Sequence, residues 1–120
     1  MENTVISGDV IRGYIDVMIL RVLLDGDSYG YEISKRITGI SGGSYSIKET
    51  TLYSAFSRLE KQKCLRSYPG SQSGGRERIY YALTDEGRRH YRRKREEWVL
   101  TKALVAKFIT EDEEEKDGRD

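Results

Sequence analysis

The sequence predicts a mainly α-helical fold with one small two-stranded β hairpin. Apolar residues recur at helical spacing in the segments before residue 63, and a long helical segment follows residue 84. Between them, two short strand-like runs flank a stretch of glycine and serine, residues 70–75, which is typical of a hairpin tip. A chain of 120 residues, 37% hydrophobic and 34% charged, suits one domain with one modest core.

The first helix is expected over residues 10–24, where Ser7 or Asp9 could cap its start. Its apolar residues form two faces. One face carries Ile11, Ile15, Met18, Ile19, Val22 and Leu23, and the other carries Tyr14, Val17, Leu20 and Leu24. A helix that is apolar on two sides is buried on two sides, so one face can meet the core and the other a partner subunit.

A second helix is expected over residues 29–38, and the glycines and serines of residues 39–46 predict a loop. A third helix, over residues 48–62, has two distinct faces at about 100° per residue. The core-facing side holds Leu52, Ala55, Phe56 and Leu59, and the outward side holds Thr50, Ser54, Ser57 and Lys61, flanked by Tyr53 and Arg58. Short hydroxyls let a helix approach base edges, and Lys or Arg can reach phosphates or guanine, so the outward face predicts DNA contact.

The predicted hairpin strands are residues 64–68 and 78–83, and Arg76 and Arg78 stand at the far side of the tip. Alternation along the strand puts both arginines on one face, from which they could reach the sugar-phosphate backbone. Thr84 is a good N-cap for the last helix, which is expected to continue to about Ile109.

The charge distribution also favours a nucleic-acid partner. The net charge of +1 conceals −3 over residues 1–27, +8 over residues 28–102 and −4 over residues 103–120. A basic middle suits a polyanion, with an affinity that falls as salt rises. Solvated helix faces are the alternative explanation, especially for the basic run over residues 88–95, which spreads around most of a helix.

Several short motifs together resemble the PadR family of bacterial transcriptional regulators, over about residues 9–98. They read DSYGYEI from Asp27, TLY from Thr51, RLE from Arg58, GRER from Gly75 and YYALTDEG from Tyr80. Each motif is weak alone, but their order and spacing are specific. The short C-terminal segment looks like the smaller PadR subfamily that includes a multidrug-responsive repressor.

This resemblance implies a winged helix-turn-helix with a long C-terminal dimerisation helix. Residues 1–84 would form the winged-helix DNA-binding domain, residues 85–110 the dimerisation helix and residues 111–120 an acidic disordered tail. The resemblance also implies a homodimer, joined through its first and last helices, that binds a palindromic operator in double-stranded DNA. Such a repressor would leave the operator when a small-molecule effector binds.

The candidate DNA-binding residues are Lys48, Thr50, Thr51, Tyr53, Ser54, Ser57, Arg58, Lys61, Arg76 and Arg78. The resemblance places an effector site at Trp98, because a tryptophan of the last helix in the drug-responsive relatives lines a pore at the dimer interface and stacks on flat ligands. Tyr14 and Val17 are its expected neighbours, together with Arg95. Trp98 could instead be a packing residue of the dimer, since Tyr91, Trp98 and Val105 are spaced seven apart.

The chain departs from the family pattern in three places. Lys63 stands where a glycine commonly ends the third helix, and a left-handed cap on such a residue costs ~1 kcal/mol, so the helix could end differently. Glu77 and Ile79 replace a proline and a base in the hairpin and dilute its positive charge. The surroundings of Trp98 carry the charges of Lys94, Arg95 and Lys102. They favour an anionic or polar aromatic effector.

Two other function classes have less support. A helical protein-interaction module that pairs through its last helix would be expected to show an acidic or bulky apolar outer face on the third helix. An enzyme is not expected, because His90 is the only histidine and no nucleophile–base spacing stands out. No cofactor or metal is expected. Cys64 alone allows no internal disulfide, no signal-like start is seen and no apolar run approaches the ~20 residues of a membrane span, so a cytoplasmic location is expected.

Overall fold

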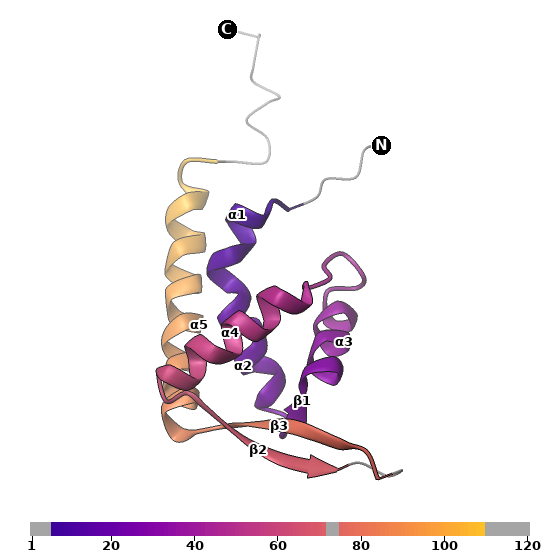
Figure 1. The fold of residues 1–120 in the computed structure, drawn as a ribbon. Helices are drawn as coiled ribbons and strands as arrows, with labels where there is room; N and C mark the ends of the chain where they lie inside the picture. The colour runs from indigo at the N-terminus through magenta and orange to yellow at the C-terminus, as the bar shows by residue number, and fades with distance from the viewer. Residues whose placement is uncertain (1–5, 72–74, 110–120) are drawn as a thin grey trace, which may run out of the picture.

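The computed structural model describes residues 6–71 and 75–109 (Figure 1). In chain order the elements are α1 (Gly8–Ile11), a 3-10 turn η1 (Arg12–Tyr14), α2 (Ile15–Leu23), β1 (Ser28–Tyr29), α3 (Gly30–Ile40), α4 (Glu49–Lys61), β2 (Leu65–Ser71), β3 (Glu77–Leu83) and α5 (Asp85–Ala106). The predicted fold class is confirmed: the protein is mostly helical, with a small antiparallel sheet and a long C-terminal helix. Part of the predicted hairpin tip and the acidic tail lie outside the described residues.

The sheet has three strands in the order β1-β3-β2, one more than the predicted hairpin. Ser28 pairs with Tyr81 and Tyr29 with Tyr80, so β1 adds a short antiparallel edge to β3. The sequence prediction placed residue 28 in a turn and residue 29 in a helix, because two residues are too few to show the alternation of a strand. The strand ties the start of α3 to the hairpin.

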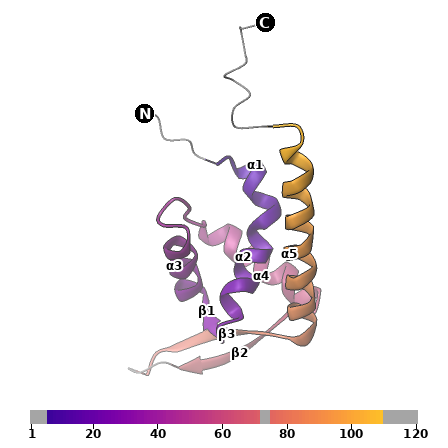
Figure 2. The ribbon, with the colours of Figure 1, turned by 180° about the vertical axis from the view of Figure 1, so that it is seen from behind.

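The predicted first helix is divided into three pieces. Ser7 caps α1 by accepting a hydrogen bond from the amide of Val10, as one of the two expected caps. The 3-10 turn η1 follows and includes Gly13, whose flexible backbone disfavours a continuous α-helix. Figures 1 and 2 show α1 and α2 running beside α5 of the same chain. Of the second apolar face, Tyr14 and Val17 lie toward Trp98 of α5, whereas Leu20 is buried in the core.

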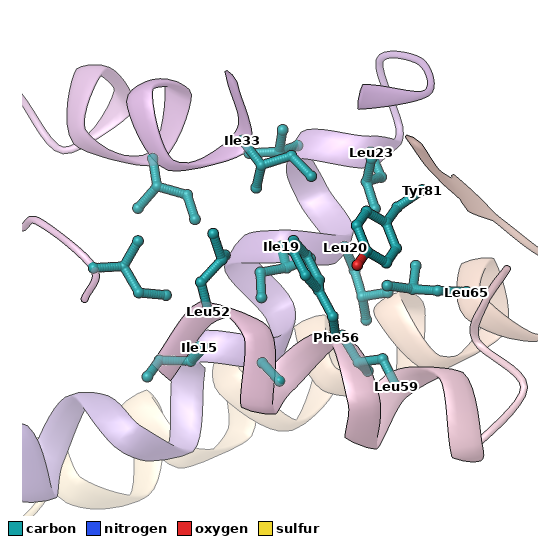
Figure 3. Close-up of a cluster of buried hydrophobic side chains, with 14 of the residues drawn as sticks. Ile15, Ile19, Leu20, Leu23, Ile33, Leu52, Phe56, Leu59, Leu65 and Tyr81 are labelled. Atoms are coloured by element: carbon teal, nitrogen blue, oxygen red, sulfur yellow. The ribbon is translucent and has the colours of Figure 1, made fainter. Parts of the chain in front are cut away.

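The core lies between α2, α3, α4 and the sheet (Figure 3). The α4 face predicted to be buried is buried, since Leu52, Ala55, Phe56 and Leu59 are each at most 2% exposed. The Phe56 ring stacks on the ring of Tyr81 with their centroids 4.0 Å apart. These contacts fix which side of α4 is left to face solvent.

The end of α4 uses a left-handed residue that is not glycine. Lys63 has a φ of 66°. The Lys63 amide donates to the Glu60 carbonyl, and the Cys64 amide donates to the Leu59 carbonyl, each at 2.9 Å. This is the hydrogen-bond pattern of a Schellman cap, so the helix ends as a glycine-capped helix would, despite the cost of a Cβ at Lys63.

Hydrogen bonds and close packing connect the start of α5 to the cap at the end of α4. The Thr84 hydroxyl accepts from the Gly87 amide at 3.0 Å and donates to the Lys63 carbonyl at 2.6 Å. Gly87 packs so tightly that a Cβ there would lie 2.3 Å from the Cys64 carbonyl oxygen. Thr84 therefore joins three elements, α4, β3 and α5, at one corner of the protein.

The distal half of α5 leaves the core and exposes large apolar side chains. The exposed residues there are Trp98, Val99, Leu100, Leu104 and Val105, and Phe108 and Ile109 follow just beyond the end of the helix. In the part of the chain that the structure describes, no helix combines the length and the hydropathy that crossing a membrane requires. An exposed apolar surface of this kind is typical of a protein–protein contact.

Candidate nucleic-acid interface

A continuous band of polar side chains runs along the outer face of α4. Thr50, Ser54, Ser57 and Lys61 are all exposed, as the helical spacing predicted. The helix crosses α2 on the side nearest the viewer in Figure 1 and on the far side in Figure 2, with the hairpin beyond its end. The band therefore lies on an open face of the molecule, where short hydroxyls can approach a flat or grooved partner.

Two polar links hold the flanks of this band. On one flank, Arg58 pairs with Asp16 of α2, with Nη2 to Oδ1 at 2.5 Å and Nε to Oδ2 at 3.2 Å. On the other flank, the Ser67 hydroxyl of β2 donates to Glu60 at 2.9 Å. The hydrogen bond to Asp16 raises the pKa of Arg58 above its ordinary value. The structure thus directs Arg58 toward α2, apart from the other candidates on α4.

The remaining α4 candidates differ in what they touch. Lys48 is exposed at the N-cap position, and its side chain makes no capping hydrogen bond. Thr51 is half-buried beside the core face. Tyr53 packs edge-on against Phe56, with ring centroids 5.3 Å apart. Its hydroxyl oxygen lies so close to Gly30 that a Cβ there would be only 2.3 Å away. Tyr53 is still 44% exposed, so part of its side chain is open to solvent.

The two hairpin arginines have different surroundings. Arg76 is exposed beside the tip. Arg78 is half-buried, with its guanidinium 4.7 Å from the centroid of the Tyr29 ring. Its Nε is buried and has no hydrogen-bond acceptor among the described residues. Arg78 therefore combines a stacked position with a buried donor that has no acceptor among the described residues, whereas Arg76 is open to solvent.

A hollow of about 530 Å³ opens between the starts of α3 and α4 and the strand β3. Tyr29, Tyr31 and Tyr53 contribute aromatic surface, and Glu49 and Glu77 stand at its sides. Arg78 lines the hollow as well, so two carboxylates stand against one guanidinium, and the balance disfavours a phosphate, while aromatic edges suit apolar contacts. Tyr29 and Tyr31 were missing from the candidate residues, although the motif from Asp27 contains both; helical periodicity alone gives no reason to single them out.

A second hollow, of about 350 Å³, lies between α5 and the α1–α2 segment. Tyr14 meets Trp98 edge-on, with ring centroids 5.5 Å apart, and Val17 lines the same space. Lys94 also lines it and pairs with Glu97 at 3.4 Å. The structure brings together three of the four candidate effector residues. Arg95, the fourth, lies over the Tyr91 ring at 5.8 Å and is not part of the lining.

The basic run at the start of α5 is partly neutralised within the chain. Glu86 pairs with Arg89 at 3.0 Å and with Arg93 at 3.1 Å, and hydrogen bonds from Arg93 and Arg89 lower the pKa of Glu86. Burial lowers the pKa of His90, and Arg93 lowers it further. Within residues 6–71 and 75–109, no three His, Cys, Asp or Glu side chains gather where they could hold a metal. The ion pairs of Glu86 with Arg89 and Arg93 favour a structural role for the basic run over residues 88–95.

Comparisons with known proteins identify the kind of fold that carries these features. Residues 19–93 match the family described as the transcriptional regulator PadR-like family. A transcriptional regulator from Clostridium thermocellum has 53% sequence identity and a TM-score of 0.80, over 86% of this chain and 100% of that one. A PadR family transcription regulator from Clostridium difficile R20291 has 38% identity and a TM-score of 0.69, over 79% and 97%. Uncharacterized protein X of Lysinibacillus sphaericus is 40% identical over 104 residues, which are 87% of this chain and 95% of that protein.

Proposed function

Because this chain belongs to the PadR-like family of transcriptional regulators, we propose that it is a dimeric repressor that binds a palindromic operator and leaves it when an effector binds. The observation that carries the proposal is the exposed band of Thr50, Ser54, Ser57 and Lys61 on α4. A helix with short side chains fits the major groove, where each base pair presents its own pattern of donors and acceptors.

In this proposal, different side chains contact the bases and the phosphates. Ser54 and Ser57, near the middle of the band, would meet base edges, and Lys61 would reach a phosphate or a guanine. Arg76 beside the hairpin tip would bind the backbone at the flank of the site. The side chain of Tyr53, which is 44% exposed, is suited to a thymine methyl group.

The proposed dimer uses the apolar surface at the distal half of α5. Leu100 is 71% exposed and Leu104 is 56% exposed, which is unfavourable in water unless a second surface covers them. Two copies related by a two-fold axis would each present the same surface to the other. The two α4 helices would then face two half-sites of one palindrome.

The proposed effector site is the hollow beside Tyr14 and Trp98. Its aromatic wall suits a planar molecule. Lys94 gives a positive charge for an acidic group, and the carboxylates of Asp9 and Glu97, which line the same hollow, could accept hydrogen bonds from a polar group on that molecule. A ligand that separated α5 from the α1–α2 segment would alter the spacing between the two reading helices of a dimer. The ligand would therefore favour a population with lower operator affinity.

Selection of bound duplexes from a random library tests the proposed function. We expect a palindrome whose half-sites lie about one helical turn apart. Lys61→Ala and Arg76→Ala should each reduce the slope of log affinity against log salt by about one. Arg92→Ala, at an exposed arginine in the first half of α5, away from the apolar surface, serves as the control and should leave the slope unchanged.

Selection can also contradict the proposal. A library that remains random after repeated rounds would mean that α4 does not read DNA. In that case, the exposed apolar surface of α5 would favour the alternative of a helical protein-interaction module. A sequence without two-fold symmetry would keep DNA binding and remove the palindromic operator from the proposal.

A further inference from the structure

The Asp16–Arg58 ion pair is a two-point polar link between the proposed reading helix and α2. Both oxygens of Asp16 accept from the same guanidinium, at 2.5 Å and 3.2 Å. The Asp16 side chain is only 16% exposed and that of Arg58 is 46% exposed. A two-point contact of this kind fixes direction as well as distance, because the guanidinium is planar and its donors form a rigid fork.

The position of this pair determines what it can do to α4. On a wheel of about 100° per residue, Arg58 lies on one side of the exposed band and Glu60 lies on the other. Arg58 is held by α2, and Glu60 is held by Ser67 of β2 at 2.9 Å. The apolar contacts of the buried face fix which side of the helix faces solvent, and a link on each flank further restrains rotation of the helix about its own axis.

A small rotation of α4 would be enough to disturb base contacts. Side-chain ends lie about 5 Å from a helix axis, so a rotation of roughly 10° moves them by about 1 Å. Hydrogen bonds from N–H donors tolerate heavy-atom distances of only about 2.7–3.2 Å. Side chains on the band would therefore lose contact with base edges while still lying near the groove.

We propose that Arg58 is a positioning residue, whose ion pair with Asp16 sets the rotation of α4 and so aims Ser54 and Ser57 at the bases. This inference rests on the proposed function, since it concerns the same DNA-reading surface. It assigns Asp16, a residue of α2, to sequence discrimination. It also removes Arg58 from the residues that touch DNA.

Two conservative variants distinguish positioning from direct phosphate contact. In Asp16→Asn the size is kept, but the charge that holds Arg58 is lost. If Arg58 bound phosphate, this variant would free it and remove a negative charge, so affinity for DNA would rise. In Arg58→Lys the positive charge is kept and the fork is lost; lysine serves well on a phosphate but cannot replace the two-point contact with Asp16.

The experiment measures the affinity of the full chain for the selected duplex and for a scrambled duplex over a series of salt concentrations. We expect Asp16→Asn and Arg58→Lys each to weaken binding of the selected duplex by about tenfold. Binding of the scrambled duplex should stay within about twofold, because phosphate contacts remain. The double variant should be no weaker than either single variant, since both remove one interaction.

Controls separate this effect from loss of fold or of charge. Circular dichroism during thermal unfolding shows whether each variant is folded at the temperature of the binding measurement. Lys61→Ala provides the signature of a lost phosphate contact, a salt slope reduced by about one. Asp16→Asn and Arg58→Lys should keep the slope of the wild type, and Arg58→Lys alone decides the question if Asp16→Asn does not fold.

Three results would overturn the inference. The first is tighter DNA binding by Asp16→Asn, and the second is normal sequence preference in Arg58→Lys. The third is a salt slope that falls by about one in Arg58→Ala, as it should for Lys61→Ala. A wild-type chain that selects no sequence would instead remove the proposed function, and this inference with it.

Discussion

Lys63 shows how a single residue can keep a required backbone conformation at a cost. Its φ of 66° lies in the left-handed region, which a Cβ disfavours. The cap requires this backbone conformation, because the amides of residues 63 and 64 both donate to carbonyls of the last turn of α4. The conformation is therefore imposed by the cap, and the residue type can be changed without changing the geometry.

Replacement of Lys63 with glycine should stabilise the protein. Lys63→Gly removes the strain of the Cβ, and we expect the free energy of unfolding to rise by about 1 kcal/mol. Urea unfolding followed by circular dichroism measures the change at a fixed protein concentration. Lys63→Ala removes the same charge but keeps the Cβ, so it should bring no such gain; an equal gain in both variants would assign the effect to the charge.

Trp98 has two proposed roles, as a wall of the effector site and as a packing residue of the dimer. Its edge-on contact with Tyr14, at 5.5 Å, places it in the wall of a hollow, and its 45% exposure leaves surface for a partner. The chain contains one tryptophan, so its fluorescence reports on this position alone. That property gives a direct measurement of ligand binding.

A planar aromatic carboxylate should quench the fluorescence of Trp98 in the hollow. Salicylate is a suitable probe, and we expect quenching that saturates and that weakens in Lys94→Ala, because Lys94 lines the hollow. Arg95→Ala is the matched control, since Arg95 lies over Tyr91 instead. Equal quenching in both variants would argue against a defined anion site.

If Trp98→Ala yields monomers, then this residue is needed for dimer packing.

At the scale of the elements, periodicity predicted those parts of the fold whose pattern is long. The 13-residue helix α4 shows three turns of alternating core and outer faces, so its buried side could be identified from the sequence. The two-residue strand β1 and the three-residue turn η1 are too short for any period to appear. The long helix α4 could therefore be predicted from its periodicity, whereas the short elements β1 and η1 could not.

Two glycine substitutions in helices should have opposite effects on stability. In Gly87→Ala the new Cβ would lie 2.3 Å from a backbone oxygen, so α5 must move away from Cys64. We expect a loss of about 1–3 kcal/mol. In Gly39→Ala the Cβ meets no atom within 4 Å, and a gain of up to about 1 kcal/mol is expected from helix propensity. Urea unfolding compares both variants, and a tolerated Gly87→Ala would show that the start of α5 can shift freely.

At the scale of the whole molecule, contacts between distant segments were the hardest to predict. Asp16 and Arg58 are 42 residues apart, and nothing in the sequence pairs them. Helical spacing put Arg58 at the flank of the polar band, but only the packing of α2 against α4 shows which partner it meets. The exposed face of α4 could therefore be predicted from the sequence, whereas the contacts that the neighbouring helices decide could not.

The apolar distal half of α5 predicts the state of the whole molecule in solution. Sedimentation equilibrium should give twice the chain mass of 13.8 kDa for the wild type. Leu104 is 56% exposed in one chain, and Leu104→Glu would bury a charge in the proposed interface. The variant should raise the dissociation constant of the dimer by roughly 100-fold. Gln62→Glu adds the same charge at the end of α4 and should leave the dimer intact. A monomeric wild type would remove the proposed interface.

The 3-10 turn at Arg12–Tyr14 divides the amino-terminal segment into parts with different anchorage. Five residues of α2 are buried in the core, whereas none of the four residues of α1 is buried. Substitutions in α1 and in the distal half of α5 therefore leave the packing beneath α4 undisturbed. Over evolution, such an arrangement would let the surface around the proposed effector site change while the proposed DNA-reading helix and its support are inherited unchanged.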